Sequence, residues 1–228
     1  MKLFEHQRTS QMKKNYPRFF ILFLLFAGCN SATQSPQSVD VIMPLAVGNE
    51  WYWDVEYYAP DGTVTGNRKD SLLITSKRTV GGVERYVLRT DPGILDAHIS
   101  YEGIAFVTYI NGYGPYIWVK YPMPLNVPDV ISTFVWTTEQ SPDPIEDAQE
   151  ILTYLGNGFS VSTPSGTYST LKYEYVTRGM STGTEYFKEY SYYALNVGLV
   201  MKETFMPDSV TKQPYMTSRE RLRKCILK

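Results

Sequence analysis

Residues 51–58 read WYWDVEYY, and this stretch decides the fold class. Its side chains fall into two alternating sets. The first set is apolar or aromatic and comprises Trp51, Trp53, Val55 and Tyr57. The second set is more polar and comprises Tyr52, Asp54, Glu56 and Tyr58. A period of two is typical of a β-strand that buries one face. The dipeptide Asp61-Gly62 predicts a turn soon after this strand.

The rest of the chain beyond residue 39 repeats this pattern of short alternating segments separated by turn residues. Hairpin turns are predicted at Gly81-Gly82 and Asn157-Gly158, and a further turn at 91–93. Further strands are expected around Leu72 and Ile74 and over residues 83–90, 94–101, 104–110, 116–121, 130–137, 151–155, 159–162, 167–177, 184–193, 197–205 and 215–227. The proline-rich stretch 121–129 is expected to be a loop or an edge crossing. The acidic stretch 139–150 is expected to be a surface loop.

These strands predict an all-β domain, because helical periodicity is almost absent. The strands form an antiparallel meander along the sequence. Roughly ten or more strands are too many for a comfortable open twisted sheet. We therefore expect a strongly curved sheet that closes into a partial barrel or splits into a two-layer sandwich.

The N-terminal segment 12–29, MKKNYPRFFILFLLFAGC, has the features of a secretory signal peptide. A basic start precedes an apolar run over residues 19–27, which is shorter than the roughly 20 residues that a transmembrane helix needs. Ala27 and Gly28 directly before Cys29 resemble the lipobox of bacterial lipoproteins. The resemblance implies cleavage before Cys29 and a lipid on its thiol. The alternative is an ordinary signal peptide with Cys29 as a small buried residue.

This resemblance sets the expected organisation of the chain. Residues 1–28 are the signal peptide, with Met12 an alternative start; residues 29–38 are the lipidated Cys29 and a flexible polar tether. Residues 39–228 form a single all-β domain. The expected location is the bacterial cell envelope, with the outer membrane favoured in a Gram-negative source because Asn30 follows the cysteine. Lipidation leaves Cys225 alone; without it, a Cys29–Cys225 disulfide becomes possible in an oxidising compartment.

Charge narrows the range of partners. The full chain has 22 Lys+Arg and 23 Asp+Glu, for a formal net charge of -1. Residues 1–28 contain five basic side chains and one acidic side chain, so the chain without them carries a formal charge of -5. This balance argues against nucleic-acid binding and against electrostatic attachment to anionic lipid. The expected contact with the membrane is therefore the acyl anchor.

Three short segments resemble a set of secreted bacterial lipoproteins that have no assigned activity. They are PSGTY at 164–168, YYALNVGLV at 192–200 and PLAVGNEW at 44–51. The first two match the patterns P-x-G-T-[FY] and Y-[YF]-A-x-x-V-G-L-V. The resemblance implies a fold class and an envelope location, and no catalytic residue. Locally, Gly166 and Gly198 are expected to adopt positive φ beside tight turns.

The search for chemistry finds no catalytic motif. Only His98 lies beyond the signal peptide, and it shares a strand face with Asp96 and Ser100, whose side chains point in parallel and do not converge as a triad requires. A solvent-facing histidine is the favoured interpretation. The acidic residues Asp143, Glu146, Asp147 and Glu150 favour a solvated loop over a calcium site. No metal and no cofactor are predicted.

The aromatic residues carry the functional hypotheses. Four tryptophans are candidates for a ligand-facing surface: Trp51, Trp53, Trp118 and Trp136. They could hold a lipid or a sugar, but the core of an all-β domain is the favoured interpretation. The leading hypothesis is a non-catalytic binding or scaffold module, with a hydrophobic ligand as one candidate. The alternatives are glycan binding through exposed aromatics and, as the weakest, hydrolysis by Asp54 and Glu56.

Overall fold

The computed structural model describes residues 40–80, 82–90, 94–100, 103–109, 115–121, 129–136 and 148–228, with side chains for 40–79, 82–90 and 148–228. Residues 40–228 form one compact unit. Its secondary structure, within the described residues, consists of strands alone. The strands are β1 (Glu50–Tyr58), β2 (Val64–Val80), β3 (Val83–Thr90), β4 (Ile94–Ser100), β5 (Gly103–Tyr109), β6 (Pro115–Tyr121), β7 (Asp129–Trp136), β8 (Ala148–Thr163), β9 (Gly166–Gly179), β10 (Glu185–Ala194), β11 (Gly198–Pro207) and β12 (Pro214–Ile226).

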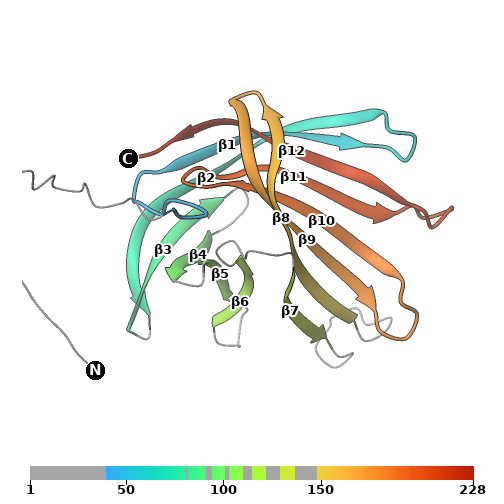
Figure 1. Cartoon of the computed structure of the whole chain (residues 1–228), viewed down its shortest axis with the longest axis horizontal. Coiled ribbons are helices and arrows are strands. Elements are labelled where there is room, and N and C mark those ends of the chain that lie inside the picture. Colours follow the sequence, from blue (N-terminus) through green and yellow to red (C-terminus); the bar gives the residue numbers. More distant parts are fainter. Residues whose placement is uncertain are drawn as a thin grey trace, which may run out of the picture. The chain divides into compact units, whose positions relative to one another are not determined.

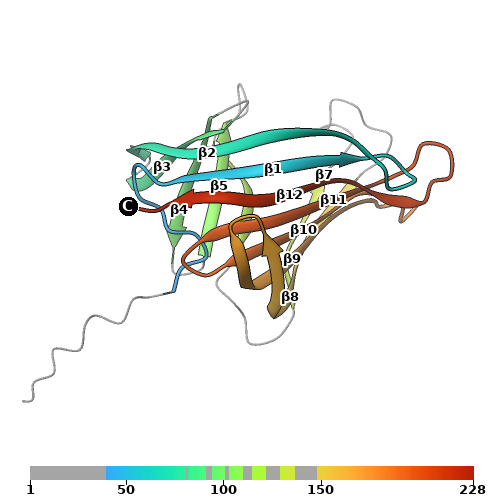
Figure 2. The same cartoon turned by 90° about the horizontal axis from the view of Figure 1, so that it is seen from above.

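These strands make one 12-stranded sheet with the order β6-β5-β4-β3-β2-β1-β12-β11-β10-β9-β8-β7. All neighbouring pairs are antiparallel. The first and the last strand lie side by side at the centre, and each half of the sheet is a meander. The sheet curls strongly into a half-barrel (Figures 1 and 2). This confirms the predicted all-β partial barrel and decides against the two-layer alternative.

Two predicted turns are confirmed, and both rely on glycine at positive φ. Gly82 has a φ of 79° in the turn that joins β2 to β3, where Val80 pairs with Val83. Gly62 has a φ of 83° in the turn after β1. In that turn the Asp61 carboxylate accepts hydrogen bonds from both the backbone N–H and the hydroxyl of Thr63, at 2.9 and 2.7 Å.

The predicted hairpin turn at Asn157-Gly158 is wrong. Strand β8 runs through this dipeptide to Thr163, and the turn lies at residues 164–165. Register shifts between β8 and β9 flank Gly156, which has a φ of 124°, and Gly158 has a φ of 79°. The glycines therefore serve bulges that bend a long strand. The predicted acidic loop also ends early, since β8 already begins at Ala148; residues 139–147 lie outside the described part.

The sheet has two chemically different faces. We define the inner face as the one that carries Trp51, Trp53 and Val55, and the outer face as the one that carries Tyr52 and Glu56. The inner face is the side toward which the sheet curls, and the N-terminal segment 40–49 crosses it (Figures 1 and 2). The hydrophobic core includes Ile42, Met43, Leu45, Trp51, Trp53, Leu72, Ile74, Leu88, Leu152, Tyr154, Leu171, Tyr173, Tyr193, Val200 and Leu222.

The distal part of the β8–β9 hairpin, residues 156–170, is here named the strap. It folds back across β10 and β11 (Figure 2), and its turn reaches β12. There the backbone N–H and the hydroxyl of Ser165 both donate to the carbonyl oxygen of Leu222, at 3.2 and 2.8 Å. Val161 is buried at 5% exposure and belongs to the core cluster. The strap is therefore an integral part of the packed unit.

Candidate functional site

The structure places two of the four candidate tryptophans in the core. Trp51 is 0% exposed and Trp53 is 5% exposed. Their indole N–H groups donate to the carbonyl oxygens of Val197 and Leu199, at 2.6 and 3.0 Å. Both polar tips are thus satisfied inside the protein, as buried indoles require. Neither ring is available to a ligand at the surface, so these two residues do not form the exposed aromatic row that glycan binding needs.

The other sequence-based candidates lie outside what the structure describes. Trp118 is in β6 and Trp136 is in β7, but their side chains are not among the described ones. The same holds for His98, Asp96 and Ser100 in β4, and Cys29 lies outside the described residues altogether. Within the described residues there is no grouping of three metal-binding side chains. The described part of the chain also contains no helix long and apolar enough to span a bilayer.

The segment 192–200, one of the three that resemble lipoproteins, packs against the segment 44–51. Gly198 has a φ of 107°, and a Cβ atom there would lie 3.1 Å from Nε1 of Trp51. The Asn196 side chain accepts from the backbone N–H of Val41 at 3.1 Å. The turn at 164–165 is the one that binds β12. These short patterns therefore encode contacts between distant parts of the chain, and the positive φ expected for Gly198 is confirmed, as is that of Gly166, at 144°.

A cavity of about 550 Å³ opens where two of these segments meet. It lies between the strap and the turn from β10 to β11. Its apolar lining comes from Tyr168, Leu171, Ala194, Leu195 and Val197, and its hydroxyl groups come from Thr167, Ser169 and Thr170. The volume falls within the roughly 300–1,000 Å³ of small-molecule sites. An apolar wall with a few hydroxyls suits a largely hydrophobic ligand.

The strap wall of this cavity is held by a small hydroxyl network. The Tyr168 hydroxyl donates to Oγ of Ser165 at 3.1 Å, and the Thr163 hydroxyl lies 2.9 Å from the same atom. Ser165 in turn binds β12, as described above. The position of Tyr168, which lines the cavity, is thus tied to the centre of the sheet through one serine.

The two carboxylates considered for hydrolysis belong to ion pairs. Glu56 lies 2.8 Å from Arg221 and also accepts from the Tyr58 hydroxyl at 2.6 Å. Asp54 lies 3.3 Å from Arg223. All of these side chains are partly exposed on the outer face. Their arrangement is that of a salt-bridged sheet surface.

The inner face also carries a row of charged residues beside its apolar core. Cross-strand pairing places Lys202 opposite both Glu220 and Ser191, and Glu189 lies two residues before Ser191 on β10. Lys202 Nζ is 2.7 Å from Glu220 and 4.0 Å from Glu189. Burial raises the pKa of the Glu189 carboxyl, while Lys202 opposes the shift. We call Glu189, Lys202 and Glu220 the inner charged row.

Two of the segments identified by resemblance lie beside the cavity, whereas the inner charged row has no distinctive pattern in the sequence. Tyr168, Leu195 and Val197 fall in the segments that were identified by resemblance. Glu189 and Ser191 alternate with Tyr190 and Tyr192, and this alternation by itself does not say which set faces inward. A polar inner face therefore has the same pattern in sequence as a solvated one.

The comparisons with known proteins find two solved structures that match this chain. One is a protein from Bacteroides fragilis described as exported and as having a YmcC-like fold; it is 14% identical, covers 83% of this chain and 100% of its own, and has a TM-score of 0.46. The other is described as a lipoprotein from Parabacteroides distasonis; it is 16% identical, covers 83% of this chain and 100% of its own, and has a TM-score of 0.43. No protein-family model and no curated protein matches the sequence.

Proposed function

We propose that the chain is a lipid-anchored protein of the bacterial envelope that binds a hydrophobic small molecule without chemical conversion. The observation that carries the binding function is the cavity between the strap and the β10–β11 turn, with its apolar wall of Tyr168, Leu171, Leu195 and Val197. The anchor rests on Cys29 and the preceding signal sequence. Two or more acyl chains hold a protein stably at a membrane.

The anchor is tested by a matched pair of cysteine variants of the full chain. Cys29→Ala is expected to abolish labelling by a radioactive fatty acid and to release the protein from the membrane fraction. Cys225→Ala is the control, because Cys225 is a half-buried thiol that is free within the described residues. It is expected to keep both the label and the membrane location. Labelling that persists in Cys29→Ala contradicts the anchor.

The ligand is tested by filling the cavity. Ser169 lines it, whereas Ser160, the cross-strand partner of Ser169, does not. Both side chains are exposed, so Ser169→Trp and Ser160→Trp are matched in their effect on folding. Native mass spectrometry of full-length protein from a bacterial envelope is expected to show a bound hydrophobic mass in wild type and in Ser160→Trp. That mass is expected to be lost in Ser169→Trp.

Two results contradict the binding proposal. One is a clean protein mass for wild type that a panel of fatty acids and isoprenoids does not change. The other is equal retention of ligand by both tryptophan variants, which would place the ligand elsewhere. Glycan binding, the earlier alternative, is not favoured by the structure, because Trp51 and Trp53 lie in the core.

A further inference from the structure

The inner charged row has one carboxylate more than its cations neutralise. Lys202 is shared by two carboxylates and lies closer to Glu220, at 2.7 Å, than to Glu189, at 4.0 Å. The neighbouring Arg68 is paired with Asp70 at 2.6 Å. These five groups sum to a single negative charge. Among the described side chains, the Glu189 carboxylate also contacts the Ser191 hydroxyl, which donates to it at 2.9 Å.

Glu189 also lies beside aromatic rings. Tyr175 of β9 is its direct cross-strand partner. Phe187 lies two residues earlier on β10, hence on the same face, and its ring meets that of Tyr175 edge-on, with centroids 6.0 Å apart. A carboxylate next to aromatic rings is the combination that recognises ammonium groups, because both the charge and the ring faces attract a cation.

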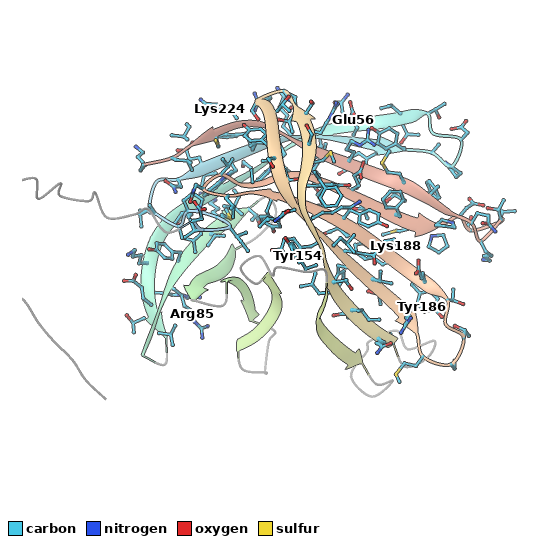
Figure 3. The ribbon with its side chains drawn as sticks, viewed as in Figure 1. Glu56, Arg85, Tyr154, Tyr186, Lys188 and Lys224 are labelled. Atoms are coloured by element: carbon cyan, nitrogen blue, oxygen red, sulfur yellow. The ribbon has the colours of Figure 1, made fainter. Side chains whose placement is uncertain are left out.

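An independent observation indicates that the inner face leaves a polar group unsatisfied. Tyr154 occupies the neighbouring cross-strand row, opposite Tyr173. Its side chain lies in the middle of the unit (Figure 3) and is 1% exposed, yet its hydroxyl has no hydrogen-bond partner among the described residues. Buried polar groups are normally paired, so an unpaired one needs an explanation. A face that receives a polar ligand provides one.

We propose that the inner face holds a second binding site, for an organic ammonium group, formed by the Glu189 carboxylate with the rings of Tyr175 and Phe187. The ligand supplies the missing positive charge of the row. This site is distinct from the strap cavity, whose recorded lining contains no charged side chain. The proposed ammonium site therefore does not depend on whether the strap cavity binds a hydrophobic ligand.

The test compares choline with dimethylbutanol, its uncharged carbon isostere, on the full-length protein purified in dodecyl maltoside. Isothermal titration calorimetry and saturation-transfer NMR measure binding. Choline is expected to bind at least about tenfold more tightly than the isostere. Glu189→Gln keeps the shape of the side chain and is expected to remove this preference. Glu185→Gln, on the same strand but exposed and paired with Lys188, is the matched control and is expected to keep it.

Two further variants test the aromatic rings and the separation of the two sites. Tyr175→Leu removes one ring and keeps the carboxylate, and is expected to weaken choline binding about three- to tenfold. Ser169→Trp fills the strap cavity and is expected to leave choline binding unchanged. The proposal is overturned if wild type does not prefer choline, or if folded Glu189→Gln, checked by near-UV circular dichroism, binds choline as wild type does. Loss of choline binding in Ser169→Trp overturns the separation of the two sites.

Discussion

The buried hydroxyl of Tyr154 gives a prediction that runs against the usual effect of a core substitution. Tyr154→Phe removes one oxygen and keeps the ring, which packs against Tyr173 with centroids 5.3 Å apart. Because the hydroxyl has no partner in the described part of the chain, no hydrogen bond is lost there. Burial alone raises the pKa of this hydroxyl, in agreement with a site that offers it no compensating group. Burying an unpaired hydroxyl costs about 1–3 kcal/mol. Tyr154→Phe is therefore expected to stabilise the protein by about 1–2 kcal/mol.

The assay is guanidinium unfolding followed by the fluorescence of the buried tryptophans, in a Cys29→Ala background that carries no acyl chain. In a parallel thermal unfolding measurement, each kcal/mol of added stability raises Tm by about 2–4 °C for a protein of this size. Tyr192→Phe is the control, because the Tyr192 hydroxyl donates to Glu203 at 3.2 Å. That variant is expected to lose about 0.5–1.5 kcal/mol. A loss of stability in Tyr154→Phe would refute the reasoning, since it would mean that the hydroxyl has a partner in solution.

Three other predictions concern Gly198, the strap and the half-buried carboxylate of Glu189. Gly198→Ala is expected to cost about 2–3 kcal/mol in chemical unfolding, because an alanine is strained at a φ of 107° and its Cβ would lie 3.1 Å from Nε1 of Trp51. Ser165→Ala is expected to cost about 1 kcal/mol and to speed amide hydrogen exchange in the strap before it does so in β1 and β12. The raised pKa of Glu189 means that the folded state holds this proton more tightly than the unfolded state. Its contribution to stability is therefore complete below the ordinary pKa of 4.5 and is lost as the pH rises through the folded-state value. The stability difference between wild type and Glu189→Gln, measured from pH 4 to 8, is expected to move against wild type as the pH rises; a constant difference would contradict the assignment.

Local sequence signals predicted the fold where side-chain alternation and turn residues agreed. The stretch 51–58 forms β1 as expected, and Gly81-Gly82 joins two antiparallel strands. Strand β2 is longer than expected, because residues 64–70 read VTGNRKD and show no apolar alternation. Their inner-face positions include Arg68 and Asp70, whose side chains form an ion pair. A strand with such residues looks like a loop in sequence.

Long-range geometry was not accessible from the sequence. The dipeptide Asn157-Gly158 is a strong hairpin signal, yet here the glycine serves a bulge that bends β8 toward β12. The choice between turn and bulge depends on contacts such as Ser165 with Leu222, which are 57 residues apart. Asn157 and Gly158, at this bend, line the cavity. Among its lining residues, Thr167, Tyr168, Ala194, Leu195 and Val197 lie in the segments identified by resemblance, but the sequence does not show that these residues meet in space.

The pairing of β1 with β12 has a consequence for the order of events when the protein is made. Glu50 pairs with Ile226, so the central seam of the sheet joins the start of the folded unit to its end. Trp51 and Trp53 lie on this seam, and their indole groups bind the backbone around the start of β11. A ribosome delivers the chain N-terminus first, so the two strongest apolar residues of β1 stay without their partners until the last strands have emerged. Such distant pairing also folds slowly. The central seam can therefore close only after nearly all of the folded unit has been synthesised, because β12 ends at Ile226.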